Sequence, residues 1–447
     1  MTTAGIILAA GKGTRMKSNT PKQLHKVAGV ALVGHVVRMM RTAGIEDISV
    51  VVSPDLADNA ELKSALLPTV NITVQVEQRG TADALNSARQ AVSGADSILV
   101  APADMILVSD ETVREIIETH NSANALATVL GVNVEDATGL GRISLDSSGS
   151  PISILEDHEA DEELLKSKLI NSAWYCFDNK WIWDELDTIQ PADTGEIYLP
   201  RAIESAAAKG RSRVVIAGDP ETGLGINDRK QLSNVERIMR QRINEAHMGS
   251  GVTIQDPATT YIDIDVEIGP DTTIGAGTHI GTKSIIGSNV TIGPNTQIIS
   301  SKIDDNAIVD GSRIVDSVVG EGAQVGTKAL IRGGTELMPG SKVGNLAEIK
   351  NSKIGSGSKV SHFSYIGDAT VGKNVNIGAG TITCNYDGKD KHPTVIEDDA
   401  QIGSSTMLIA PVTIGKAAIT GAGSVVRIDV VAGDTVAGVP AKSIKSR

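Results

Sequence analysis

A glycine-rich loop near the N-terminus carries the first residues whose types and spacing could do chemistry. The segment LAAGKGTRM follows a short apolar run, and positive charge gathers in and beside it at Lys12, Arg15, Lys17 and Lys22. Small residues let backbone N–H groups approach a phosphate closely. The loop fits neither the G-x-x-x-x-G-K-[ST] nor the G-x-G-x-x-G pattern. We expect an anion-binding loop of another kind, with an ordinary glycine-rich turn as the alternative.

The surrounding elements must present this loop at the edge of a sheet. Short apolar runs alternate with amphipathic segments from residue 1 to about 226, which predicts an α/β fold with a mostly parallel sheet. The expected strands are 5–10, 48–53, 72–76 and 97–101, and the expected helices are 31–42, 82–92 and 110–120. Such sheets bind ligands at the carboxyl ends of their strands, so the loops after these strands are the expected binding loops.

A helix is expected to follow this region and to connect it to a second domain. Asn227 or Asp228 can cap it, and the run continues to about Met248 before Gly249-Ser250-Gly251 ends it. The predicted organisation is a first domain at 1–227, a connecting helix at 228–250 and a second domain at 251–447.

A six-residue repeat begins after this helix. Glycines recur at 269, 275, 281, 287 and 293, most of them after isoleucine, and the same phase resumes at 320, 326, 372, 378, 403 and 415. This period is typical of a parallel β-helix, in which about three hexads make one coil. We expect the aliphatic residue of each hexad to point inward and to stack on its copies in adjacent coils, which stabilise one another.

The composition bears on partners and location. The net charge of −13 argues against a nucleic-acid partner, because such binding needs a basic face. Cys176 and Cys384 lie far apart and define no metal or disulfide framework, which favours a reducing compartment. No apolar stretch approaches the roughly 20 residues of a membrane span, and the first residues lack the basic region of a signal peptide. We expect a soluble, cytoplasmic protein with no membrane partner.

The loop motif also carries a family resemblance. L-x-A-G-x-G-T-R-M, followed by Pro21-Lys22-Gln23, resembles the sugar-1-phosphate nucleotidylyltransferases. Joined to a long hexapeptide domain, nearly the whole chain resembles the bacterial bifunctional UDP-N-acetylglucosamine pyrophosphorylase/glucosamine-1-phosphate N-acetyltransferases. This resemblance implies a Rossmann-like nucleotidyltransferase domain followed by a left-handed parallel β-helix of hexapeptide repeats.

The resemblance also implies two reactions. Acetyl-CoA would donate an acetyl group to glucosamine-1-phosphate, and UTP would then donate a uridylyl group to N-acetylglucosamine-1-phosphate with release of pyrophosphate. In the second reaction a sugar-phosphate oxygen attacks the α-phosphorus in line, and positioning and charge neutralisation supply the catalysis.

By this resemblance the first domain binds UTP. Arg15 and Lys22 are the implied catalytic residues, and Gln75 would pair with the uracil edge because an amide offers both a donor and an acceptor. A polar strand end followed by a turn is the alternative for the run from Gln75 to Ala82. The implied nucleotide-binding residues are Leu8, Ala10, Gly11, Gly13, Lys22, Gln75, Gly80 and Thr81.

The resemblance further implies one or two Mg²⁺ ions per subunit. Asp104 matches the magnesium-binding aspartate and Asn227 its distant partner, and two oxygen ligands with substrate phosphates and water suit Mg²⁺. The implied sugar-phosphate-binding residues are Gly141, Glu156, Asn171 and Asn227. The chain departs from the family pattern around the sugar phosphate in the runs Ala103-Asp104-Met105, Asn171-Ser172-Ala173 and Glu196-Ile197-Tyr198-Leu199-Pro200.

In the second domain the resemblance assigns an acetyl-transfer site. His362 would be the general base that takes a proton from the attacking amine, for which its ordinary pKa near 6.5 is suitable, and Glu348 would orient it. A surface or satisfied core histidine is the alternative for His362. The implied sugar-phosphate-binding residues are Arg332, Lys350, Tyr365 and Asn376.

The implied acetyl-CoA-binding residues are Ala379, Asn385, Tyr386, Ser404 and Ala422. In the family such contacts lie between subunits, which implies a homotrimer. Corner ladders of the solenoid are the alternative for Asn376 and Asn385. Gly438 stands where the family usually has an arginine, and Lys442, Lys445 or Arg447 of the short tail is the candidate replacement.

Two other functions compete with the bifunctional enzyme. The β-helix could be a purely structural or regulatory module, as in the glucose-1-phosphate adenylyltransferases, but such a module would not need His362 and Asn385. The chain could instead be a binding protein with an inactive first domain. Four residues argue against that alternative: Arg15, Lys22, Asp104 and Asn227.

Overall fold

The computed structural model describes residues 1–192 and 195–444 and divides into two compact units, Met1–Met239 and Arg240–Arg447. The division falls inside helix α7 (Arg229–Gly249). Asp228 is the residue that caps this helix, because the N–H groups of Lys230 and Gln231 donate to its Oδ1 at 2.8 and 2.9 Å. Within the described ranges, no helix has the length and apolar character needed to cross a membrane.

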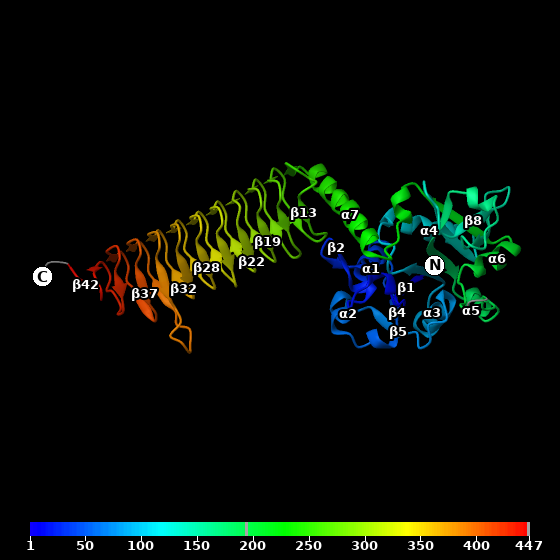
Figure 1. Ribbon diagram of the computed structural model, residues 1–447, viewed down its shortest axis with the longest axis horizontal. Coiled ribbons are helices and arrows are strands. Elements are labelled where there is room, and N and C mark those ends of the chain that lie inside the picture. The colour runs from blue at the N-terminus through cyan, green and yellow to red at the C-terminus, as the bar shows by residue number, and fades with distance from the viewer. Residues whose placement is uncertain (193–194, 445–447) are drawn as a thin grey trace. The chain divides into compact units, whose positions relative to one another are not determined.

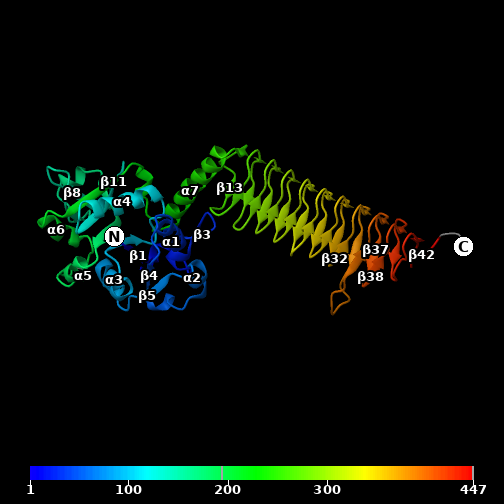
Figure 2. The ribbon, with the colours of Figure 1, turned by 180° about the vertical axis from the view of Figure 1, so that it is seen from behind.

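The first unit is built on a mixed sheet. Its path runs β11 (Ser212–Ala217), β7 (Ala127–Asn133), β10 (Leu169–Asp178), β6 (Ser97–Pro102), β1 (Thr3–Leu8), β4 (Ile48–Val52) and β5 (Asn71–Val74), and the hairpin of β8 (Arg142–Leu145) and β9 (Pro151–Leu155) joins it at β10. Figure 2 shows β1, β4 and β5 beside one another. These strands and β6 are parallel, as the sequence predicts, whereas β10 runs antiparallel to both β6 and β7.

Helices cover both faces of this sheet. Ala4 and Ile6 of β1 belong to the core beneath α3 (Thr81–Ser87), α5 (Trp181–Leu186) and α6 (Arg201–Ala208). Gly5, on the opposite face of the same strand, lies against Met40 of α1 (Leu32–Thr42), which packs on α4 (Asp110–Ser122). A strand that is apolar on both faces requires such double cover.

Two expected elements end differently in the structure. The expected helix 82–92 is broken, because α3 stops at Ser87 and Ala88 leaves the helical conformation before a 3₁₀ turn at Arg89–Val92. The first strand ends at Leu8 rather than Ala10, so Ala9 and Ala10 belong to the glycine-rich loop. A short helix, α2 (Ala60–Ala65), precedes β5.

The second unit is a parallel β-helix with three faces (Figure 1). We call the sheet from β12 (Thr253–Ile254) to β42 (Lys442–Ser443) face 1, the sheet from β13 (Tyr261–Ile262) to β40 (Val425–Val426) face 2, and the sheet from β14 (Glu267–Ile268) to β38 (Val412–Ile414) face 3. The site strands of face 2 are β25 (Leu330–Arg332), β28 (Glu348–Lys350), β31 (Tyr365–Gly367) and β34 (Ile382–Cys384). On face 1, β30 (Lys359–Val360) and β33 (Asn376–Ile377) flank the same region.

The hexad residues form the core of this unit as predicted. On face 1, Ile274 pairs with Ile292 and Ile292 with Val309, and each is at most 1% exposed. At the start of the solenoid, the buried Asn244 of α7 donates to the carbonyls of Pro257 (3.0 Å) and Thr260 (3.1 Å). The connecting helix therefore closes the first coil, which would otherwise expose apolar core.

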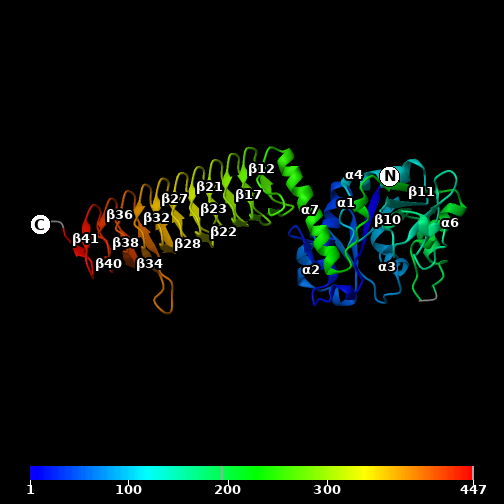
Figure 3. The same cartoon turned by 45° about the horizontal axis from the view of Figure 1, so that its top comes forward.

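One loop interrupts the repeat. Most coils advance by 17 or 18 residues, as from Lys359 to Asn376, but Asn376 pairs with Gln401. The extra residues lie between β34 and β35 (Thr394–Ile396) and leave the stack as a projecting loop, 385–393, next to β34 (Figure 3).

The close approach of neighbouring coils requires glycine at some hexad positions. A Cβ on Gly355 would lie 2.1 Å from the carbonyl oxygen of Gly372 in the next coil.

We expect Gly355→Ala to destabilise the second unit by about 1–3 kcal/mol, because the added methyl group overlaps backbone that cannot rotate away. Hydrogen exchange of the amides in β29 (Lys353–Ile354) and β32 (Ala369–Val371) would measure the local opening. Gly281→Ala is the matched control, since its Cβ would make only ordinary contacts from 3.5 Å. Equal protection in the two variants would contradict the role given to coil-to-coil approach.

Candidate active sites

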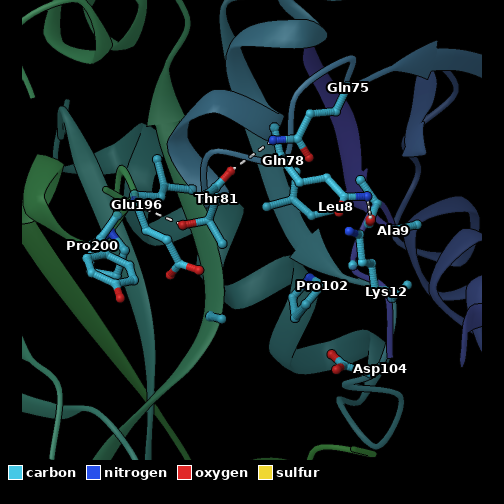
Figure 4. Close-up of a pocket in the computed structure, with 18 of the residues that line it drawn as sticks. Leu8, Ala9, Lys12, Gln75, Gln78, Thr81, Pro102, Asp104, Glu196 and Pro200 are labelled. Atoms are coloured by element: carbon cyan, nitrogen blue, oxygen red, sulfur yellow. Dashed lines mark hydrogen bonds between the residues drawn. The ribbon is translucent and has the colours of Figure 1, made fainter. Parts of the chain in front are cut away.

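A cavity of about 520 Å³ lies in the first unit where β1, β5 and β6 end (Figure 4). The loops after these three strands line it, as the sequence predicts for a parallel sheet. The lining residues from these loops are Leu8, Ala9, Ala10, Gly11, Lys12, Gln75, Gln78, Gly80, Thr81, Pro102, Ala103 and Asp104.

Two glutamines hold the glycine-rich loop by its carbonyl groups. Gln23 donates to the Ala9 oxygen at 2.7 Å and Gln78 donates to the Ala10 oxygen at 2.8 Å. The Ala9 N–H donates to the Val51 oxygen at 2.8 Å, so the N–H groups that follow it in the loop, from Ala10 onward, are the ones suited to bind an anion. Sequence reasoning gave these glutamines no role, although both occur inside the motifs that carry the resemblance.

The predicted base-binding residues form one end of the cavity. Gln75 is 3% exposed, and its amide nitrogen donates to Asp83 (2.8 Å) and to the Gly80 oxygen (3.1 Å). This fixes the amide so that its carbonyl oxygen is left for a donor. Gly80 has φ 116°, and a Cβ there would lie 2.5 Å from the Ile197 oxygen, so the chain requires glycine. Thr81 accepts from the Leu199 N–H at 3.0 Å.

Lys22, Asp104 and Asn227 meet although they are far apart in the sequence. The Lys22 ammonium donates to the Asp104 carboxylate and, at 2.8 Å, to Asn227 Oδ1. A hydrogen bond from the Ile226 N–H to the Asp104 backbone oxygen, 3.1 Å long, joins the two segments that carry the oxygens. Two oxygen donors that converge on one cation fit a hard metal ion such as Mg²⁺.

The described residues contain no cluster of three or more His, Cys, Asp or Glu side chains arranged to hold a metal. A divalent cation bound by Asp104 and Asn227 would therefore take further ligands from substrate phosphates and water, as Mg²⁺ commonly does.

Another part of the cavity lining is acidic and carries two of the three runs that depart from the family pattern. It consists of Glu156, Asn171, Ala173, Tyr175, Glu196, Tyr198, Leu199 and Pro200. Asn171 donates to the Tyr175 hydroxyl at 2.7 Å, and Ala173 stands at φ 61° in a bulge of β10. Burial, followed by the nearby Glu159 carboxylate, raises the pKa of Glu156 above its ordinary value.

Some predicted residues lie next to the cavity rather than in its lining. A Cβ on Gly13 would fall 2.5 Å from Lys22 Cβ, and one on Gly141 would fall 3.6 Å from Glu156 Oε1, so both glycines support lining residues. Arg15 is exposed on a 3₁₀ turn (Thr14–Met16) and is not part of the lining. The structure therefore supports Lys22 as a cavity residue more directly than Arg15.

In the second unit, four predicted residues gather on or beside face 2. Register places Arg332 beside Lys350, and Lys350 beside Gly367. A Cβ on Gly367 would lie 2.4 Å from the Tyr365 hydroxyl and 2.9 Å from Asn385 Nδ2, so glycine leaves room for both side chains. Two cations, a phenol and an amide thus lie on adjacent coils, which suits a sugar phosphate.

Glu348 pairs with Arg332 in this structure, and its role in orienting His362 stays a prediction. Its Oε1 accepts from Arg332 Nε (2.9 Å) and Nη2 (2.6 Å). His362 Nδ1 accepts the Asn345 N–H at 3.1 Å, so the neutral ring carries its proton on Nε2. In this arrangement the ring must turn away from Asn345 before it can take a proton from a substrate.

The projecting loop adds a cation that sequence reasoning missed. Lys391 forms an antiparallel backbone bridge with Tyr386, and its side chain lies within hydrogen-bonding reach of the Lys350 ammonium, which lowers the pKa of Lys391. Asp387 organises the loop, because it accepts from the N–H groups of Lys389 and Asp390 and from His392 Nε2. The interruption of the hexads was the available signal for Lys391.

His362 shares one corner of the solenoid with the predicted acetyl-CoA contacts. Backbone hydrogen bonds run from Gly380 to the His362 oxygen (2.9 Å), from Ser405 to the Ala379 oxygen (2.7 Å) and from Gly423 to the Ser404 oxygen (2.8 Å). The structure therefore stacks the following residues in one column between faces 1 and 2: His362, Ala379, Ser404 and Ala422.

Other predicted residues lie apart from the face 2 residues. Asn376 is exposed on face 1, whereas Asn385, placed beside face 2 above, donates to Asp368. The exposed Tyr386 donates to the Gly388 oxygen at 2.8 Å, within the projecting loop. Lys442 is exposed, and Lys445 and Arg447 lie outside the described residues.

Known proteins resemble both units. A family model of the MobA-like NTP transferase domain matches residues 5–169, and one of the bacterial transferase hexapeptide (six repeats) matches residues 265–300 and 393–427. The bifunctional protein GlmU of Syntrophomonas wolfei is 44% identical over 432 residues, covering 96% of this chain and 96% of that protein. The proteins of the same name from Heliobacterium modesticaldum and Clostridioides difficile are 42% and 41% identical, over 96% and 95% of this chain and 93% and 92% of theirs.

We expect Glu156→Gln to stabilise the first unit at pH 8. The raised pKa of Glu156 means that its ionised form costs free energy in the fold, and this cost appears as pH rises through the folded-state pKa. At pH 4 wild type and variant should be equally stable. All three tryptophans, at 174, 181 and 183, lie in this unit, so tryptophan fluorescence during denaturation reports on it alone. The exposed Glu118→Gln is the control, and a larger gain there would refute the assignment.

Proposed function

The chain belongs to the family of bifunctional GlmU proteins, and we propose that its two units catalyse two successive steps of UDP-N-acetylglucosamine synthesis. Residues 251–447 acetylate glucosamine-1-phosphate from acetyl-CoA, and residues 1–227 then transfer uridylyl from UTP to the product, as a UDP-N-acetylglucosamine diphosphorylase. A cytoplasmic location stays a prediction.

The proposed uridylyl transfer is supported best by the convergence of three sets of residues on one cavity. The glycine-rich loop offers N–H groups for the triphosphate, and Gln75 presents a fixed carbonyl oxygen to which the N3–H of uracil can donate. Lys22 reaches the phosphates from the cation site. This arrangement distinguishes uracil from cytosine, whose N3 is an acceptor.

The mechanism in this cavity is an in-line displacement. A phosphate oxygen of the sugar phosphate attacks the α-phosphorus of UTP, the new P–O bond forms opposite the bond to the β-phosphate, and pyrophosphate leaves. Asp104 and Asn227 would hold Mg²⁺, which when bound supplies charge neutralisation to the phosphates. The protein's own contribution is to position both anions and to hold the loop and Lys22 around them.

For acetyl transfer, the cationic side chains on face 2 and the column of residues at the corner between faces 1 and 2 have separate tasks. Arg332, Lys350 and Lys391 neutralise the phosphate of the sugar, and the column that contains Ala379, Ser404 and Ala422 offers small side chains along which acetyl-CoA can lie. The sugar amine attacks the thioester carbon, the C–S bond breaks, and His362 removes the amine proton. The thiolate leaves and takes up a proton.

We also propose that this site is completed between copies of the chain. Asn376 lies on face 1, away from the cluster on face 2, although the resemblance assigns both to one sugar phosphate. A homotrimer brings face 1 of one copy toward face 2 of the next. Sedimentation of the full chain tests this, because a monomer that acetylates at the full rate would contradict it.

Two variants should separate the two activities. Asp104→Asn should abolish pyrophosphate release and leave acetyl transfer intact, because it removes a charged oxygen from the cation site of the first unit alone. His362→Ala should slow acetyl transfer by about 10²–10⁴-fold, which is the typical cost of losing a general base, and leave uridylyl transfer unchanged.

Each variant is the control for the other, and each reaction is followed separately by mass spectrometry of its product. A normal acetylation rate in His362→Ala would remove the histidine from the mechanism. If the wild type acetylated nothing at all, the β-helix would be better explained as a structural or regulatory module.

A further inference from the structure

Lys22 holds the two oxygens to which the metal role is assigned. Its ammonium donates to the Asp104 carboxylate and to Asn227 Oδ1. The Lys22 and Asp104 side chains are only 17% and 21% exposed, so water screens this ion pair less than one on the surface. The lysine therefore stands at the position that a divalent cation would need.

The backbone that carries the two oxygens is anchored, whereas the ammonium is movable. Asp104 and Asn227 are carried on backbone segments joined by the Ile226–Asp104 hydrogen bond, and the Asn227 N–H is also bound, to Gln231 Oε1 at 2.7 Å. Lys22 approaches on a flexible four-carbon stem whose start lies against Gly13. A change of rotamer can withdraw the ammonium without moving either oxygen.

An ammonium and a divalent cation cannot share these two oxygens, because like charges at such short range repel strongly in a partly buried site. The same ammonium is also a ligand for substrate phosphates in the proposed uridylyl transfer. Lys22 can serve the phosphates only by leaving Asp104 and Asn227, and that movement frees both oxygens.

We propose that Lys22 is a built-in competitor of the metal ion, displaced when the phosphates of the nucleotide draw its ammonium away. The inference rests on the proposed uridylyl transfer and adds a binding order to it. The metal binds weakly to the free protein and tightly together with UTP. The pair Lys22–Asp104 also keeps the carboxylate neutralised between turnovers.

The expected size follows from the competition. If the ammonium holds the oxygens in about 90% of molecules, the apparent dissociation constant of the metal is raised about tenfold over the intrinsic value. Removing the ammonium should recover that factor. By linkage, UTP should also strengthen metal binding less in the variant than in the wild type.

The test uses the full chain and Mn²⁺ as the probe, with free Mn²⁺ measured by electron paramagnetic resonance. Without nucleotide, Lys22→Met should bind Mn²⁺ about tenfold more tightly than the wild type, and adding Asp104→Asn to that variant should abolish the gain. Lys22→Gln, which keeps a neutral donor, provides a second variant if the methionine disturbs folding, and tryptophan fluorescence reports the folding of each.

Lys26→Met is the matched control, because Lys26 is an exposed lysine four residues away and its loss removes the same net charge. Tighter Mn²⁺ binding by Lys22→Met than by Lys26→Met supports the competition, and equal or weaker binding overturns it. Wild-type uridylyl transfer is assayed alongside. If the wild type transfers uridylyl groups but the Lys22 variants bind Mn²⁺ no more tightly than the wild type, the competition alone is refuted. If the wild type transfers no uridylyl groups, the proposed function is refuted.

Discussion

The contact of Lys22 with Asp104 and Asn227 is the interaction on which the first unit's site depends. It joins the loop after β1, the end of β6 and the segment before α7, which are separated by up to 205 residues. A chain with a net charge of −13 must concentrate its cations to attract triphosphate. Placing one of them on the Asp104 carboxylate also keeps that carboxylate from repelling the substrate.

The second unit depends on a different constraint, the close approach of backbone between coils. The Gly355–Gly372 approach shows that side chains are excluded at some corners. Small residues at such positions leave a corner open for a long ligand, and the column at His362 has this character. Function then arises where the repeat changes, at charged residues on face 2 and at the loop 385–393. The regular hexads supply the rigid frame that holds these exceptions in register.

The sequence predicted those features that repeat or that follow from strand direction. The hexad isoleucines predicted the inner columns, and the strand–helix alternation predicted the edge where the three binding loops meet. It did not predict the antiparallel β10, since an apolar run does not record the direction of its strand. Gln23 and Gln78 were missed because their partners are backbone carbonyls, which leave no trace in side-chain type. The pair of Glu348 with Arg332 was also not predicted, because it depends on register across coils.

The polarity of the cavity determines how a sugar phosphate can lie in it. One end holds Lys22 and the anion-binding loop, and the other holds Glu156 and Glu196. A phosphate is repelled from the carboxylates and drawn to the lysine, whereas sugar hydroxyl and amide N–H groups are donors that carboxylates accept. The sugar must therefore enter with its phosphate toward the nucleotide. The family departures at Ala173 and Pro200 line the acidic part of the cavity, where they alter the fit of the sugar, whereas the departure at Ala103 lies next to Asp104 and the cation site.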